Sequence, residues 1–248
     1  MRRASTAAAF TIALFGSATA SAHGGHEHEP GPETRPRWGG LGYMQLGTFI
    51  GPVGDIGRSL RAEGSLGPGA TSPEFAYTIG GGGRSLLLSR LVIGGKGFGI
   101  FAPRVGSEAG TASFNGGGGG LELGIAAVNR KKWLFIPYVG GGGAGLGVDV
   151  TNDGTTPLAI GDDEPIPSGG RRRYESGFGY LEFGAGTHRL FFMGSGGFAL
   201  GFDVGAILSV GPTAWSNERG ATLNAIDRPT LRGAYLRLSI GGGGFTFG

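Results

Sequence analysis

Three histidines near the start of the chain have the residue types and spacing of a metal site. His23, His26 and His28 alternate with Glu27 and Glu29. Imidazole and carboxylate groups this close together bind Zn²⁺, Cu²⁺ or Ni²⁺. Because prolines and glycines surround the cluster, the favoured interpretation is a flexible, solvated tail, with metal binding as the alternative.

Charged residues of both signs also gather in a long polar segment between residues 152 and 174. The acids could hold divalent cations, and the arginines could meet the phosphates of lipopolysaccharide. A merely solvated charged loop is the favoured interpretation. The residues concerned are Asp153, Asp162, Asp163, Glu164, Arg171, Arg172 and Arg173.

Hydrolysis or acyl transfer would need a serine nucleophile with a histidine and an acid in reach. His188 is the one histidine outside the N-terminal cluster, and it is expected at a short turn. Candidate serines and acids lie on other strands or loops. We therefore expect no enzymatic activity and no cofactor.

The elements that must position these groups are β-strands. The clearest is the segment Gly197 to Gly211, in which apolar residues occupy the even positions and, apart from Ile207, small or polar residues the odd ones. Strict alternation predicts a strand with one apolar face. Its length exceeds the usual 5–6 residues of strands in soluble proteins and suits a tilted membrane strand of about 9–11 residues.

Seven further segments alternate in the same way, around residues 38–49, 75–80, 91–101, 121–127, 144–150, 181–186 and 234–241. The alternation is expected to break at Gly94-Gly95 in the third. Leu146, Val148 and Val150 are assigned to the apolar outer face of the fifth. The residues predicted to face lipid include Phe198, Leu200, Phe202, Val204, Leu236 and Leu238.

Charged residues fall on the opposite face of these strands. In a narrow barrel such charges would compensate one another across the lumen. The favoured interpretation is a plug of ion pairs that closes the barrel, and a polar path for a small solute is the alternative. The predicted lumen charges are Glu122, Asp149, Glu182, Asp203, Arg237, Arg84 and Lys96.

The connections between these segments alternate between long and short along the whole chain. Long ones span residues 51–73, 152–174 and 212–230, a medium one spans 103–111, and short ones lie near residues 89–90, 129–132 and 187–189. Long loops at one end and short turns at the other are typical of transmembrane barrels. A soluble sandwich gives no reason for such sorting. The sequence therefore predicts an all-β fold, a closed up-and-down antiparallel transmembrane β-barrel of about eight strands.

The N-terminal residues 1–22 have the order of an export signal: Arg2-Arg3, an apolar stretch, and a small-x-small site ending at Ala22. Cleavage there would leave a His- and Pro-rich periplasmic tail of residues 23–36 and a barrel of residues 37–248. Beyond the signal, no apolar run reaches the ~20 residues of a membrane helix.

Composition supports strands and excludes other classes. There are 57 glycines in 248 residues, and each interior glycine costs a helix about 1 kcal/mol relative to alanine. Glycine runs are expected at bends and close backbone approaches, although small inward residues could also leave the lumen open. The chain has no cysteine for disulfides, and no basic stripe for nucleic acid.

The export signal, the eight alternating segments, the sorted loops and the Phe245-Thr246-Phe247 ending together resemble small Gram-negative outer-membrane barrels of the OmpA, OmpX and OmpW type. The resemblance is architectural and indicates no subfamily. It implies an outer-membrane location, contact with outer-membrane lipids and lipopolysaccharide, and insertion by the barrel-assembly machinery. Gly248 departs from the aromatic ending of such proteins.

The sequence leaves three functions open. We expect a structural or envelope-maintenance barrel whose loops face the exterior. A passive channel or transporter for small solutes is the alternative, and a soluble exported adhesive β-protein is less favoured because its apolar face would be exposed to water.

Overall fold

The computed structural model describes residues 35–51, 75–106, 109–193, 196–223, 228 and 230–247. Eight long strands build the wall: β1 (Pro36–Ile50), β2 (Phe75–Leu87), β3 (Leu91–Phe101), β5 (Gly110–Ile125), β7 (Trp133–Asn152), β8 (Arg171–Met193), β9 (Gly196–Val210) and β12 (Arg232–Phe247). Four short ones accompany them: β4 (Val105–Gly106), β6 (Val128–Arg130), β10 (Trp215–Asn217) and β11 (Thr222–Leu223).

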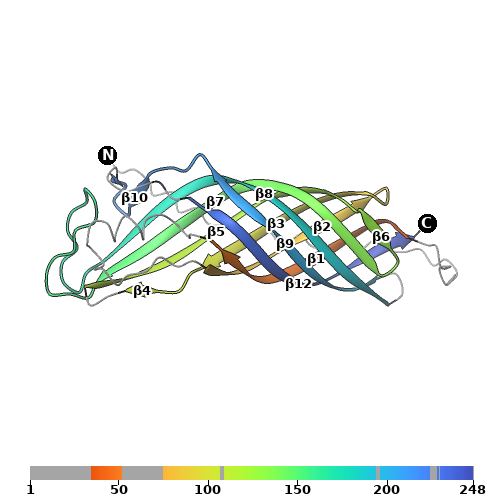
Figure 1. The fold of residues 1–248 in the computed structure, drawn as a ribbon, viewed down its shortest axis with the longest axis horizontal. Helices are drawn as coiled ribbons and strands as arrows, with labels where there is room; N and C mark the ends of the chain where they lie inside the picture. Colours follow the sequence, from red (N-terminus) through yellow and green to blue (C-terminus); the bar gives the residue numbers. More distant parts are fainter. Residues whose placement is uncertain are drawn as a thin grey trace.

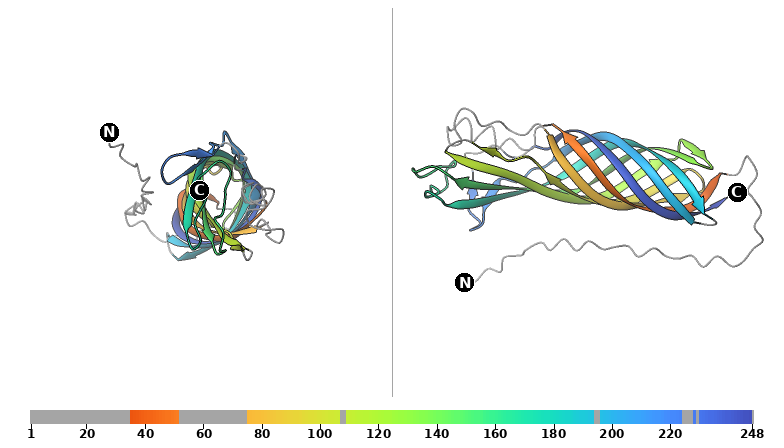
Figure 2. Two further views of the ribbon diagram at one scale, coloured as in Figure 1. Left: turned by 90° about the vertical axis from the view of Figure 1, so that its left-hand side faces the viewer. Right: turned by 90° about the horizontal axis from the view of Figure 1, so that it is seen from below.

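The wall is a closed antiparallel barrel. Each long strand pairs with the next one along the chain, β1 pairs with β12, and pairing of β7 with β8 completes the ring. Figure 1 shows the steeply inclined strands, and the view along the barrel in Figure 2 shows the ring. The predicted fold class, an all-β up-and-down barrel of eight strands, is confirmed.

The two ends of the barrel differ. At the short-turn end, Leu87 and Leu91 are joined by a three-residue turn, and β1 begins beside the end of β12. At the long-loop end, β5, β7 and β8 extend beyond the other strands. There β10 pairs with β8, and β11 pairs with β10. No helix in the described ranges is long and apolar enough to cross a membrane.

The strand registers set the width of the barrel. A row of paired residues that starts at Gly145 of β7 and passes through every wall strand returns to β7 at Phe135, ten residues away. A stagger of ten residues over eight strands inclines the strands by roughly 35–45° and leaves an interior that side chains can fill.

Side chains alternate between the lumen and the outer surface on every wall strand. On β9, Phe198, Leu200, Phe202 and Val204 are exposed, whereas Asp203 between them is fully buried. Leu236 and Leu238 of β12 are exposed in the same way. The six residues predicted to face lipid therefore all lie on the outer surface, within a belt of exposed apolar side chains.

Two of the predicted faces were wrong. Alternation in β3 is not broken at Gly94-Gly95, because Val92, Lys96 and Ile100 are all buried. Val92 and Ile100, near the two ends of the strand, are apolar although they point into the barrel, and this made the alternation look broken.

In β7, Leu146, Val148 and Val150 are buried in an apolar cluster inside the barrel, and not on its outer face. Asp149 alternates with them and therefore points outward, so its assignment to the lumen was wrong. The error came from assuming that every apolar face contacts lipid. At the long-loop end the inside of the barrel is apolar as well.

The link predicted near residues 187–189 was also misplaced. β8 runs unbroken to Met193, and β9 begins at Gly196. His188 lies within β8, with 1% of its surface exposed, and it points into the lumen. The three consecutive polar residues Thr187, His188 and Arg189 suggested a turn. In the structure they continue the strand, with His188 buried in the lumen and Arg189 pointing outward.

The inward glycines are sterically required. A Cβ on Gly94 would lie 2.7 Å from Oε1 of Glu122, and one on Gly82 would lie 2.9 Å from Cβ of Lys96. By contrast, a Cβ on the outward Gly143 would meet no atom within 4 Å. Inward glycines thus give space to large neighbours on adjacent strands, and they do not leave the lumen empty.

The exposed apolar belt generates a prediction about Phe202, near the middle of β9. Phe202→Arg should reduce membrane insertion, because an arginine at mid-bilayer costs a barrel about 2–4 kcal/mol. The measurement is folding yield into lipid vesicles, read from heat-modifiable gel migration. Ser85→Arg, outward and close to the short-turn end, is the control, with an expected cost of about 0–1 kcal/mol. Equal yields for the two variants would contradict the lipid-facing assignment.

Candidate functional site

The middle of the lumen holds six charged side chains from six strands. The cations are Arg84 of β2, Lys96 of β3 and Arg237 of β12. The carboxylates are Glu122 of β5, Glu182 of β8 and Asp203 of β9. Each of these side chains is at most 3% exposed. Because three positive and three negative charges share this space, the set is formally neutral.

The six groups form one continuous network. Arg84 pairs with Glu122 and, through Nη2, with Oδ1 of Asp203 at 2.8 Å. Nζ of Lys96 lies 3.2 Å from Glu122 and 2.7 Å from Oε1 of Glu182. Nη1 of Arg237 donates to the same Oε1 at 3.1 Å. Mutual pairing is what makes burial of such charges tolerable.

Neutral and aromatic side chains surround the network. Nη1 of Arg84 lies 2.6 Å from Nε2 of His188. Because a guanidinium can only donate, Nε2 is the acceptor in this contact and the proton of the neutral ring is on Nδ1. The hydroxyls of Tyr138 and Tyr235 are 2.8 Å apart. The guanidinium of Arg237 stacks 3.9 Å from the ring centroid of Tyr235, a cation–π contact.

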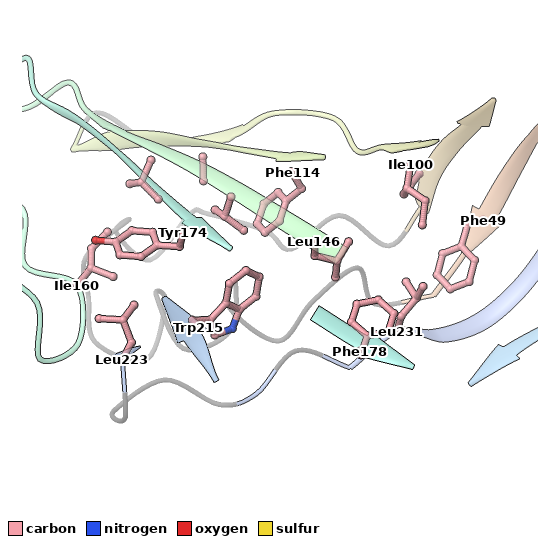
Figure 3. Packing of buried hydrophobic residues seen from close by; sticks show 14 of the residues in the cluster. Phe49, Ile100, Phe114, Leu146, Ile160, Tyr174, Phe178, Trp215, Leu223 and Leu231 are labelled. Atoms are coloured by element: carbon pink, nitrogen blue, oxygen red, sulfur yellow. The ribbon is translucent and has the colours of Figure 1, made fainter. Parts of the chain in front are cut away.

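Apolar layers close the lumen on both sides of the network. Toward the short-turn end lie buried residues that include Leu41, Leu134, Leu190 and Phe245. Toward the long-loop end lies a larger cluster, shown in part in Figure 3, which includes Phe49, Ile100, Phe114, Leu146, Phe178, Trp215 and Leu231. The sequence of layers along the axis is therefore apolar, ionic and apolar.

The long-loop end is covered by a folded cap, which we call the crown, made of residues 153–170 and 211–223. Trp215 is fully buried and packs among Ile160, Tyr174 and Leu223 (Figure 3). Leu158 and Ile166 exchange backbone hydrogen bonds of 2.8 Å. The expectation of a merely solvated charged loop was wrong for this segment, because its apolar residues fold over the barrel mouth.

Asp163 joins the two parts of the crown. Its carboxylate accepts hydrogen bonds from Nη1 of Arg172 at 2.9 Å, from the Tyr174 hydroxyl at 3.1 Å and from Nδ2 of Asn217 at 3.1 Å. Burial alone would raise the pKa of Asp163, but the bonds from Arg172, Asn217 and the Glu164 amide hold it below its ordinary value of 3.8. Asp163 is therefore an anionic cross-link of the crown.

Asp149 belongs to a separate polar cluster on the outer wall. It lies 2.8 Å from Nη2 of Arg171 and 3.3 Å from Nη1 of Arg173. The arginine run Arg171-Arg172-Arg173 is thus divided by strand alternation: the first and third point outward, and Arg172 points into the crown.

The predicted metal ligands His23, His26 and His28 lie outside the described residues. In the part of the chain that is described, no group of three or more potential metal ligands comes together. His188 is close to acids of the network, but the Arg84 contact occupies its Nε2. The absence of enzymatic activity stays a prediction.

Comparison with known proteins gives a fold-level likeness only. No family model matches the chain, and no curated protein matches it. Among solved structures, Ail, the attachment invasion locus protein of Yersinia pestis, has 7% identity and a TM-score of 0.42, covering 85% of this chain and 98% of its own. The outer membrane protein AlkL, solved in DMPC bilayers, has 10% identity and a TM-score of 0.31, covering 91% and 97%.

The fold assignment rests on the structure itself, a closed antiparallel barrel of eight long strands, and indicates no subfamily. Several residues that build the interior and the crown were not predicted from the sequence: Tyr138, Tyr235, Trp215 and Asn217. For the two tyrosines a signal existed, since each holds an inward position in an alternating strand. No comparable signal marked Trp215 and Asn217, which lie in a region taken for a loop.

The ionic network generates a prediction about Glu182. Glu182→Gln should destabilise the barrel by about 3–5 kcal/mol, because it leaves the buried cations of Lys96 and Arg237 without their shared carboxylate. Urea unfolding in lipid vesicles measures the change. Arg219→Gln breaks an exposed pair with Glu164 and is the control, with an expected effect of about 0–1 kcal/mol. A loss below about 1 kcal/mol for Glu182→Gln would contradict the role of the network.

Asp163 generates a pH prediction. Because its folded-state pKa is lowered, its contribution is present at neutral pH and is lost as the pH falls below about 4, through the folded-state pKa. Trp215 fluorescence, with Trp38 and Trp133 changed to Phe, should report crown opening only in acid. Asp163→Asn should weaken the crown at pH 7 by about 1–2 kcal/mol and flatten this acid response. An unchanged acid transition in that variant would assign the transition to another group.

Proposed function

We propose that the protein is a closed outer-membrane barrel with a structural or envelope-maintenance role, which holds its crown at the exterior. The observation that carries this proposal is the filled lumen: a neutral network of six buried charges lies between two apolar layers. A barrel filled in this way can anchor a surface structure but offers no aqueous path.

The outer surface supports membrane placement. Exposed apolar side chains lie on all eight wall strands, including Met44, Ile79, Ile93, Leu123, Val139, Phe183, Leu200 and Leu238. Exposed tryptophans Trp38 and Trp133 lie at the short-turn end, and Tyr77 and Phe101 lie toward the other end. An apolar band flanked by aromatic residues is typical of outer-membrane barrels.

The glycines that point into the lumen do not favour the alternative function, a passive channel. The space beside Gly186 is taken by Asp203, whose Oδ1 would lie 2.5 Å from an added Cβ. The space beside Gly184 is taken by Tyr138, whose Cζ would lie 2.8 Å from one. These glycines accommodate the plug, so a glycine-lined strand is compatible with a closed lumen.

The remaining parts of the proposal concern export and assembly. Cleavage after Ala22 would release the chain to the periplasm, and the barrel-assembly machinery would insert it with the short turns inside. The last strand supports this route, since β12 ends on Phe245 and Phe247 and pairs with β1 to close the ring. Outer-membrane lipids and lipopolysaccharide would then surround the apolar belt.

Single-channel recording in a planar bilayer tests the proposal. Folded wild-type protein should insert and give no steady conductance. The double variant Arg237→Ala, Glu182→Ala removes two opposite charges from the plug and should produce measurable openings if it folds; Leu238→Ala, outward on the same strand, is the control. Steady openings of the wild-type protein would favour the channel, and failure to insert would overturn the membrane placement.

A further inference from the structure

The outer wall carries a polar cavity at the long-loop end. Its volume is about 120 Å³, and it is lined by Arg104, Thr111, Ala112, Ser113, Asp149, Thr151 and Arg171. Since about 10–15 Å³ of such space holds one water molecule, a group of several heavy atoms fits. The lining offers two guanidinium groups and three hydroxyls, and these are the donors that proteins direct at phosphate oxygens.

The charge of the cavity favours an anion. Among the described residues, Asp149 is the one acid that lines the cavity, and it lies 2.8 Å from Nη2 of Arg171. Arg173, outside the lining, is shared between Asp149 and Glu175. Arg104 is exposed and makes no ion pair with a described residue. A divalent cation would face this excess of arginines, whereas an anion would complete it.

Strand alternation places a bare trough on the same outer surface. From the cavity toward the apolar belt, the outward row that contains Asn115 is followed by two rows of glycine: Gly117, Gly145 and Gly177, then Gly119, Gly143 and Gly179. The next outward row contains Leu121 and Leu181, both exposed.

Packing of the wall does not demand glycine at three of these six positions, whereas an added Cβ on Gly117 would lie 2.9 Å from the backbone oxygen of Phe98. An added Cβ would meet nothing within 4 Å at Gly143, and its nearest atoms would be 3.5 Å away at Gly145 and 3.8 Å away at Gly177. Open space therefore lies against the backbone at these positions, next to the apolar belt. Toward the polar cavity it is bounded by the row of Asn115, Gly147 and Glu175, where a Cβ on Gly147 would lie 2.9 Å from Nη2 of Arg173.

We infer that this wall of β5, β7 and β8 binds one phosphate-bearing lipid of the outer leaflet. The phosphate occupies the cavity between Arg104 and Arg171, and an acyl chain lies along the glycine trough. The chemistry recognised is a phosphate ester, and the trough selects a lipid source over free phosphate. The inference rests on the proposed membrane placement, since only then does the trough face lipid chains.

Native mass spectrometry of the folded barrel, released from detergent micelles, tests the site. The probes are phosphatidic acid, diacylglycerol with the same chains, and inorganic phosphate. Phosphatidic acid should be retained and diacylglycerol should not. Arg104→Gln combined with Arg171→Gln should weaken phosphatidic acid binding by about tenfold or more, since it removes two charge-assisted contacts.

Gly143→Leu tests the trough, because its side chain fills the open space. It should weaken phosphatidic acid binding several-fold and leave the response to inorganic phosphate unchanged. The matched controls are Arg219→Gln, an exposed crown arginine outside the cavity lining, and Gly40→Leu, an outward glycine of β1 whose added Cβ would be 3.8 Å from its nearest atom. Both controls should bind like the wild type.

The remaining outcomes would overturn the lipid site or reassign it. Full retention of phosphatidic acid by the double arginine variant, or equal retention of diacylglycerol by the wild type, would overturn the site. Inorganic phosphate competing as well as the lipid, with no effect of Gly143→Leu, would reassign the cavity to free phosphate. Insertion into vesicles is scored separately by heat-modifiable migration, so failure of the membrane placement is distinguished from failure of the site.

Discussion

The interior of this barrel depends on the mutual neutralisation of buried charge. Arg84, Lys96 and Arg237 meet Glu122, Glu182 and Asp203 where the wall excludes solvent, and each group has at least one partner of opposite sign. Removing water from a single charge costs several kcal/mol, so the set is tolerable only when complete. Because the six groups come from six strands, the network also links distant parts of the wall across the axis.

Closure of the ring brings the six charged side chains together and limits the volume that is available to inward side chains. A narrow lumen cannot hold a large side chain at every inward position, so large residues alternate with glycine across neighbouring strands. Lys96 is paired with Gly82 on one side and Gly120 on the other. Tyr138 is flanked by Gly124 and Gly184 in the same way. Much of the high glycine content therefore follows from packing density, and it produces a filled interior.

Glycine on the outer surface has a different basis. Inward glycines are excluded from substitution by their neighbours, whereas Gly143 has open space above it. Glycine thus occurs on both surfaces of the wall for different reasons. Inside the barrel it is required by packing, and outside it depends on what lies against the wall. The crown shows a third arrangement, in which a loop rich in charge is ordered by one buried tryptophan, Trp215, and one carboxylate cross-link, Asp163.

The sequence by itself determined the strands, the outward apolar residues such as Phe202, and six of the seven lumen charges, because alternation with period two is a local property of the chain. It could not place Asp149, Val148 or His188. Their sides and neighbours depend on how far β5, β7 and β8 extend past the other strands and on what folds over their ends. The ten-residue stagger of the closed ring decided which charged side chains pair with one another. It also decided whether small inward residues leave a pore or lie beside a large neighbour. Pairing across a barrel is a non-local property, and only the tertiary structure contains it.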